Sequence, residues 1–251
     1  STGGDVILKG TIDLNADPDE DEGKANDITI TADAGSILNR SGSAIAIDEV
    51  NNLTLTAKGS IGSADKPITV NAKTISLTSK DAAANDADIY ITNTPNILNI
   101  DDSGDGDTVS LTKIDTGITG NITYRQSGQK LTISGPIKSY GGNILIDPPT
   151  DLTINETIDG DGGDVTAEAN GNITFGANGY IVTKGTGNIL VQADMDSSGA
   201  GNLAFTYAGT TTDAGETLKT FERVRTTGAD GTGTGTGTID LRGEKVIMEN
   251  Y

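Results

Sequence analysis

Three acidic runs contain the residue types best suited to hold a metal ion. They lie at positions 17–22, 101–107 and 159–164, and glycines stand within or beside each of them. Hard cations such as Ca²⁺ take oxygen ligands from carboxylates, hydroxyls and carbonyls in flexible loops. Calcium is therefore the one cofactor that the sequence suggests, with these candidate ligands: Asp101, Ser103, Asp105, Asp107, Asp159, Asp161 and Asp164.

The two later runs only partly match known calcium loops. Asp101, Ser103 and Asp105 fit the opening of an EF-hand loop, but Thr112 stands at the twelfth position, where a bidentate Glu is required. The run at 159–164 is similar to a glycine-aspartate calcium repeat, but it occurs once and in a different order. The alternative for each run is a solvated acidic turn without metal.

Other catalytic chemistry is limited by missing residue types. The chain has no Cys and no His. Disulfides, thiolate catalysis and zinc-thiolate sites are thus excluded. The side chain best suited to acid–base work near neutral pH is also missing. We expect a protein that is not an enzyme.

The charge excludes further classes of partner. Seventeen basic and 36 acidic residues give a net charge of −19, which repels phosphate backbones and anionic lipids. No apolar run approaches the roughly 20 residues of a membrane span. We expect no nucleic-acid binding and no membrane insertion. No basic-then-apolar leader precedes Ser1, so we expect a mature or excised segment of an exported protein.

A repeat organises most of the chain. A Gly-Asn or Gly-Asp pair followed by an aliphatic residue recurs at Ile122, Ile144, Val165 and Ile189, with spacings of 22, 21 and 24 residues. Each unit holds two further aliphatic clusters, and the same pattern occurs earlier in the chain. The second clusters are Leu131, Leu152 and Ile173, the third are Ile137, Ile158 and Ile181, and the earlier pairs are Ile28 with Leu53 and Ile37 with Ile61.

The repeat predicts an all-β fold, a right-handed parallel β-helix (β-solenoid). Aliphatic residues alternate with Thr, as in Ile28-Thr29-Ile30, which is the period of a strand with one buried face. Units of this size cannot form separate cores, but stacked units bury a continuous column. We expect three strands and roughly 21–25 residues per coil, and aromatics at only 4% indicate a narrow aliphatic interior.

The corners and insertions follow from the same pattern. Gly and Asn between strands are expected to supply positive φ. Asn before an aliphatic-Thr strand could also form an internal hydrogen-bonded ladder. Segments 80–88 and 195–201 are expected to be loops inserted at one corner, and a third, acidic insertion runs from 15 to 26.

The predicted domain organisation is a β-helix of roughly eight to ten coils over residues 1–212 and an irregular cap or linker over 213–251. The second part contains the Gly-Thr repeat at 231–238, which is either flexible or a loosely wound last turn. Register between 93 and 120 is ambiguous. The pentapeptide GTIDL occurs at 10–14 and 237–241. This recurrence has two explanations. Either the chain is one unit of a longer tandem array or its two ends stack head to tail, or the pentapeptide recurs by chance.

A family resemblance supports this fold. The strings NLTLTAKGSIG, GNITFGANGYI and GNILVQADMD resemble repeats of filamentous-haemagglutinin-like adhesins and other giant bacterial surface proteins, over roughly residues 1–205. The resemblance implies export to the cell surface or beyond, a long rod, and a role in attachment or matrix building. The amino-terminal secretion domain of such proteins does not occur in this sequence.

The parallel β-helix also resembles the scaffold of pectate lyases and polygalacturonases. Asn93-Thr94 and Asp101-Asp102 partly match the clustered aspartates of the hydrolases, but the histidine is missing. Lyases need calcium and an arginine base, and no local motif surrounds any of the five arginines, at 40, 125, 223, 225 and 242.

We therefore expect a structural or adhesive extracellular protein, either a rod segment of a large surface protein or the subunit of a self-assembling fibre. The expected partners are further copies, as a homo-oligomer or head-to-tail polymer, and a polysaccharide or a host or cell-surface receptor. The alternatives are a polysaccharide-active β-helix enzyme and a calcium-stabilised scaffold.

Overall fold

The structure is a computed structural model that describes residues 4–13, 27–42, 45–80, 87–95, 108–117, 119–147, 150–205, 212–213, 216–217, 223–232 and 234–248. These residues form strands and turns and contain no helix. The strands of the first half are β1 (Val6–Leu8), β2 (Ile12–Asp13), β3 (Asp27–Ala32), β4 (Ile37–Asn39), β5 (Ile47–Ala57), β6 (Ile68–Ser79), β7 (Ile89–Asn93), β8 (Thr108–Asp115), β9 (Ile122–Gln126), β10 (Lys130–Ile133) and β11 (Ile137–Lys138). Those of the second half are β12 (Ile144–Asp147), β13 (Leu152–Ile154), β14 (Thr157–Asp159), β15 (Val165–Glu168), β16 (Ile173–Phe175), β17 (Tyr180–Lys184), β18 (Ile189–Gln192), β19 (Asn202–Phe205), β20 (Thr212–Asp213), β21 (Glu216–Thr217), β22 (Val224–Thr227), β23 (Ile239–Arg242) and β24 (Lys245–Met248).

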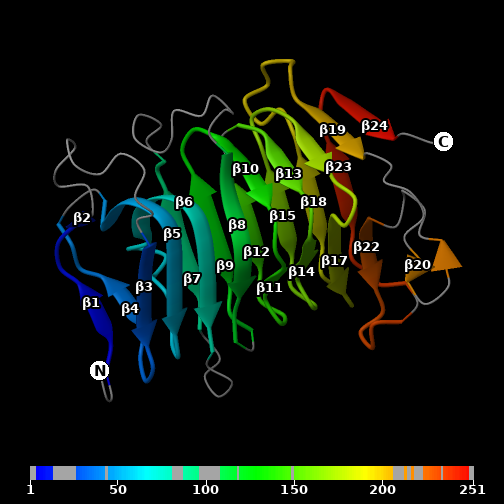
Figure 1. Ribbon diagram of the computed structural model, residues 1–251. Coiled ribbons are helices and arrows are strands. Elements are labelled where there is room, and N and C mark those ends of the chain that lie inside the picture. Colours follow the sequence, from blue (N-terminus) through cyan, green and yellow to red (C-terminus); the bar gives the residue numbers. More distant parts are fainter. Residues whose placement is uncertain are drawn as a thin grey trace.

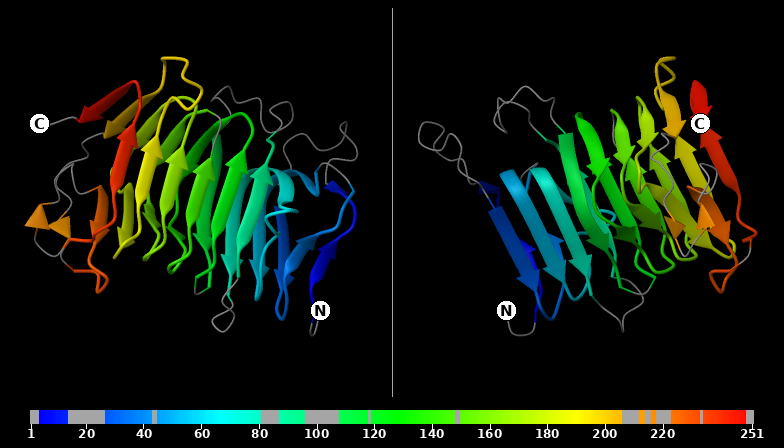
Figure 2. Two further views of the ribbon diagram at one scale, coloured as in Figure 1. Left: turned by 180° about the vertical axis from the view of Figure 1, so that it is seen from behind. Right: turned by 45° about the vertical axis from the view of Figure 1, so that its right-hand side comes forward.

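Most strands belong to one large parallel sheet that curls nearly closed around an axis, like a solenoid or a barrel (Figure 1). Most strands of this sheet pair with one strand about a repeat earlier in the chain and one about a repeat later. The strands therefore follow one another along the axis from the N-terminal end to the C-terminal end (Figure 2). β20 and β21 form a separate antiparallel pair.

Three columns of inward residues run along the axis. The first consists of Val6, Ile37, Ile61, Ile89, Ile122, Ile144, Val165, Ile189 and Ile239, each paired with the next. The second consists of Ile28, Leu53, Ile75, Leu111, Ile133, Ile154, Phe175 and Phe205. The third consists of Ile30, Leu55, Leu77, Ile114, Ile137, Ile158, Ile181 and Val224.

These columns confirm the predicted register of the repeat. Leu131, Leu152 and Ile173 also stand directly over one another, beside the second column. Nearly all column residues are buried. The interior is mainly aliphatic, as predicted, with two exceptions: the Phe175 and Phe205 rings stack at 4.7 Å, and Tyr124 is fully buried.

The ambiguous region is partly settled. Val109 and Ile114 both lie in β8, which pairs with β6 on one side and with both β10 and β11 on the other. Ile97 and Ile118 lie outside the described residues. β5, β6 and β8 are thus each one continuous strand. At the corresponding place, later parts of the chain form two short strands separated by a turn, such as β10 and β11.

The C-terminal part adds to the same sheet. β22, β23 and β24 pair in parallel with β17, β18 and β19. The predicted division at residue 212 stays a prediction. The two GTIDL copies occupy different positions, since Ile12 pairs with Ile47 whereas Ile239 pairs with Ile189.

The inserted segments are only partly described. Residues 195–201 form a turn between β18 and β19, as predicted, and all of them except the buried Gly201 are exposed. Residues 81–86 and 14–26, which contain most of the other two predicted insertions, lie outside the described residues.

Candidate functional site

A row of short polar side chains follows the first column along the whole axis. We name it the axial ladder: Asp5, Ser36, Ser60, Asp88, Asn121, Asn143, Asp164, Asn188 and Thr238. Each member directly precedes a first-column residue. Its side-chain oxygen accepts a hydrogen bond from the backbone N–H of the next member, at 2.7–3.2 Å in all eight steps.

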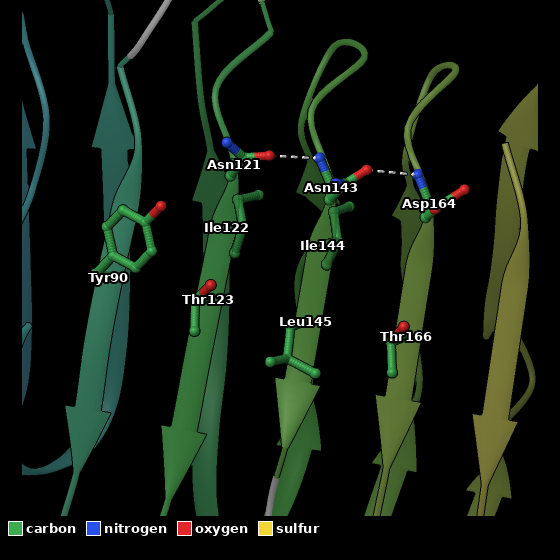
Figure 3. Close-up of a pocket in the computed structure, with 9 residues that line it drawn as sticks. All are labelled: Tyr90, Asn121, Ile122, Thr123, Asn143, Ile144, Leu145, Asp164 and Thr166. Carbon is green, nitrogen blue, oxygen red and sulfur yellow. Dashed lines mark hydrogen bonds between the residues drawn. The ribbon is translucent and has the colours of Figure 1, made fainter. Parts of the chain in front are cut away.

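Figure 3 shows two of these steps, in which Asn143 N–H donates to Asn121 and Asp164 N–H donates to Asn143. The sequence suggested an internal ladder of Asn. The observed ladder is half-buried to exposed and mixes Asn with Asp, Ser and Thr, so that prediction is wrong in its location and only partly right in its residues. Sequence reasoning missed Ser36, Ser60 and Thr238 as members. The signal that could have found them is a short polar residue between Gly and an aliphatic residue.

A glycine precedes every ladder residue except Asp88, which follows Ala87, and this glycine has a steric reason. A Cβ on Gly142 would lie 2.1 Å from the Gly120 carbonyl oxygen, and one on Gly163 would lie 2.0 Å from that of Gly142. Gly237, in the Gly-Thr run, would meet the carbonyl of Gly187 in the same way. The Gly-Asn/Asp pair is thus a packing requirement of stacked backbones.

The prediction that Asn supplies positive φ at corners is wrong for the described residues. Gly141, Gly162 and Gly185 do have positive φ. The non-glycine residues with positive φ include Tyr140 and Asp161, but none is Asn. Asn is used instead as a hydrogen-bonding side chain in the ladder.

The candidate calcium ligands at 159–164 contact protein groups. Lys138 Nζ lies 3.2 Å from Asp159 Oδ2, and Lys184 Nζ lies 2.5 Å from Asp161 Oδ1. Asp164 belongs to the axial ladder and accepts from Asn188. The described residues contain no group of three or more acidic side chains arranged to hold a metal ion. Asp101, Ser103, Asp105 and Asp107 lie outside the described residues, so calcium binding there stays a prediction.

Charged groups on the strands form short rows across neighbouring steps. Burial alone would lower the pKa of Lys138, but the hydrogen bond and the charge of Asp159 outweigh it and raise that pKa. Burial raises the pKa of Glu168, the adjacent Asp147 raises it further, and Arg125 partly opposes both. These shifts have local structural causes.

A buried polar network occupies the interior beside β7 and β9. Asn93, which the sequence comparison with hydrolases singled out, bonds both backbone groups of Ala72 and donates to the Tyr124 hydroxyl at 3.2 Å. That hydroxyl donates to Gln126 Oε1 at 2.7 Å. Burial raises the pKa of Tyr124, opposed by the hydrogen bond from Asn93. The network is shielded from solvent and satisfies its own members.

Three arginines are engaged in structural contacts. Arg223 is buried and donates to the carbonyls of Gly176 and Gly179. Arg125 and Arg242 each form an ion pair, with Asp147 and Asp240 respectively.

A shallow, open depression lies on the outer face of β7, β9, β12 and β15 (Figure 3). Its floor carries the outward side chains Tyr90, Thr123, Leu145 and Thr166, and the axial ladder borders it. Such a surface offers one ring and several hydroxyl and amide groups, which suits weak contact with an extended polar ligand.

Comparisons of the chain with protein-family models, with curated proteins and with solved structures found no match. Among the described residues, none forms a helix long and apolar enough to cross a membrane.

Proposed function

We propose that this chain is a right-handed parallel β-helix with three strands per coil that serves as a structural rod outside the bacterial cell. It would be a segment of a large surface protein or the subunit of a fibre. The observation that carries the proposal is the axial ladder, because its members repeat one hydrogen bond at every step from Asp5 to Thr238. A contact that repeats at each coil builds length rather than a single site.

The use of the polar residues favours a structural role over catalysis. Asn93 and Arg223, which an enzyme could have used, are buried and hydrogen-bonded to backbone carbonyls. Asp159 and Asp161 are paired with lysines. Each group stabilises the stack of coils.

Attachment is proposed to occur on the lateral faces. The depression beside Tyr90 and Leu145 is open and shallow, so it fits an extended polysaccharide or a loop of a cell-surface receptor better than a small substrate. The net charge of −19 favours a neutral or basic partner.

The rod proposal is tested by removing one coil. Deleting residues 143–163 joins Gly142 to Asp164, which restores a Gly-Asp pair and lets β9 pair with β15 in the present register. We expect a folded variant that is shorter by about 4.8 Å along the axis, the spacing of one strand. Circular dichroism and small-angle X-ray scattering measure both properties.

The matched control deletes residues 143–152, about half of a coil, and leaves the columns out of phase. We expect this variant to lose cooperative unfolding. The proposal of a modular rod is refuted if the whole-coil variant loses as much of its folded structure as the half-coil variant does.

A further inference from the structure

β23 and β24 each expose an inward side chain whose partner one step earlier is buried. Ile239 is 43% exposed, whereas Ile189 directly below it in the first column is 1% exposed. Val246 is 41% exposed, and Leu203 below it is fully buried. The described residues contain six exposed large hydrophobic side chains, and three of them lie on β23 and β24: Ile239 and Val246 continue buried rows, and Ile247 follows the outward-facing Ala204. The apolar columns therefore continue to a surface at this end.

The opposite end presents the complementary half of the same contact. β1 and β3 are the outermost strands there, and among the described residues they pair on one side only, with β4 and β5. Val6 is the first residue of the first column, and Ile7 on the outer face is 46% exposed. Asp5 is the first residue of the axial ladder. At every later step the backbone N–H of the ladder residue donates to the side chain of the ladder residue before it, and Asp5 has the equivalent N–H.

We propose that a second copy of this chain stacks end-on, with its β1 and β3 continuing the ladders that end at β23 and β24. This inference rests on the proposed rod and names its partner. In the first column Val6 of the second copy follows Ile239, and in the second column Ile28 follows Met248, which pairs with Phe205. The Asp5 N–H then donates to Thr238 Oγ1, as Thr238 N–H does to Asn188 at 2.9 Å.

Charges at the two ends favour this register. Continuing the ladders places Asp27 diagonally opposite Lys245, at the separation where opposite charges attract across strands. Residues 1–36 carry nine acidic and two basic side chains, whereas residues 216–251 carry six and five. Each copy still has a net charge of −19, so we expect salt to strengthen the stacking by screening the overall repulsion.

The first test places a charge on the exposed end. Val246→Lys removes apolar area that stacking would bury and adds an unpaired charge there, so we expect the dissociation constant of end-on association to rise about tenfold or more. Sedimentation velocity over a range of protein and salt concentrations measures it, and negative-stain electron microscopy shows whether the assemblies are linear.

The control is Met195→Lys, which makes the same change at a lateral turn where the side chain is 38% exposed. It should associate like the unchanged chain. Equal weakening by both variants, or an unchanged chain that remains monomeric at high concentration and high salt, overturns end-on stacking. Neither result bears on the coil-deletion test, so the rod and its stacking can fail separately.

The second test reads the register by cross-linking, which a chain without cysteine allows. Ile7→Cys combined with Asp240→Cys places the two thiols directly opposite each other across the junction, within the Cα separation of about 4.4–6.8 Å that a disulfide needs. We expect a series of covalent oligomers on a non-reducing gel. Lys9→Cys with Asp240→Cys is diagonal, at about 7–8 Å, and should cross-link poorly. Equal cross-linking of both pairs contradicts the proposed register.

Discussion

Gly163 illustrates at the residue scale why a Gly-Asn or Gly-Asp pair marks the repeat. A Cβ here would meet the Gly142 carbonyl at 2.0 Å, and the backbone on which it stacks cannot move without disturbing the next step. We expect Gly163→Ala to lower the free energy of unfolding by about 3 kcal/mol through overpacking. Urea denaturation measures this change.

Gly10→Ala is the control, since a Cβ at Gly10 has no heavy atom within 4 Å. We expect a change of at most about 0.5 kcal/mol for this surface substitution. Comparable losses in the two variants would show that the steric explanation of the repeat is wrong.

Glu168 shows how a charge row affects stability. The pKa of Glu168 is raised in the folded protein, so folding favours its protonated form. The stability that this gives is fully present below the ordinary pKa of a glutamate and is lost as the pH rises through the raised pKa of the folded state. Glu168→Gln should therefore stabilise the protein by about 0.5 kcal/mol at neutral pH, the scale of a cross-strand charge contact. The advantage should disappear as the pH falls below the ordinary pKa of a glutamate.

Denaturation of both proteins between pH 3.5 and 7, roughly the range that spans a glutamate titration, measures this difference. Glu156→Gln removes the same charge from a half-buried position in the turn between β13 and β14 and serves as the control. A difference that does not change with pH, or that Glu156→Gln reproduces, would contradict the assignment to Glu168.

At the scale of elements, the sequence predicted most where each strand is short and bounded by glycine. The first-column register from Ile122 to Ile189 was readable because the Gly-Asn/Asp pair punctuates every unit. β5 and β6 were harder to delimit because neither contains a glycine, and each continues through a corner. β23 was missed because 50 residues separate Ile189 from its partner Ile239, about twice the ordinary period.

The candidate sites were less predictable than the fold. Residue types alone identified Asp159, Asp161 and Asp164 as oxygen donors. Their actual partners, Lys138, Lys184 and Asn188, come from neighbouring steps 21 to 24 residues away. The two lysine contacts depend on which outward side chains share a row, and Lys138 and Lys184 occupy positions that carry no repeating pattern from which the rows could be read.

A proline test separates strand from corner. Ile144→Pro deletes the N–H that donates to the Asp164 carbonyl at 2.8 Å, and we expect a loss of about 3 kcal/mol or more. Thr157→Pro is the control, because Thr157 occupies the position that Pro136 holds one coil earlier. We expect little change there. Thermal unfolding of both variants checks the strand assignment, and it fails if Ile144→Pro is tolerated as well as Thr157→Pro.

For the whole molecule, the net charge of −19 complicates any stabilisation by calcium, because every cation screens the repulsion between carboxylates. A bound ion acts differently, since it stabilises by mass action at concentrations near its dissociation constant. If the run at 101–107 binds Ca²⁺, about 1 mM CaCl₂ should raise Tm by roughly 3–5 °C, and NaCl of equal ionic strength should raise it less.

The variants assign that effect to one run. Asp101→Asn with Asp105→Asn should abolish the calcium-specific part of the Tm shift. Asp159→Asn with Asp161→Asn should leave it in place, because those two carboxylates are already paired with Lys138 and Lys184. A Tm that responds to CaCl₂ and NaCl alike would mean that the acidic runs act on the rod only through their charge.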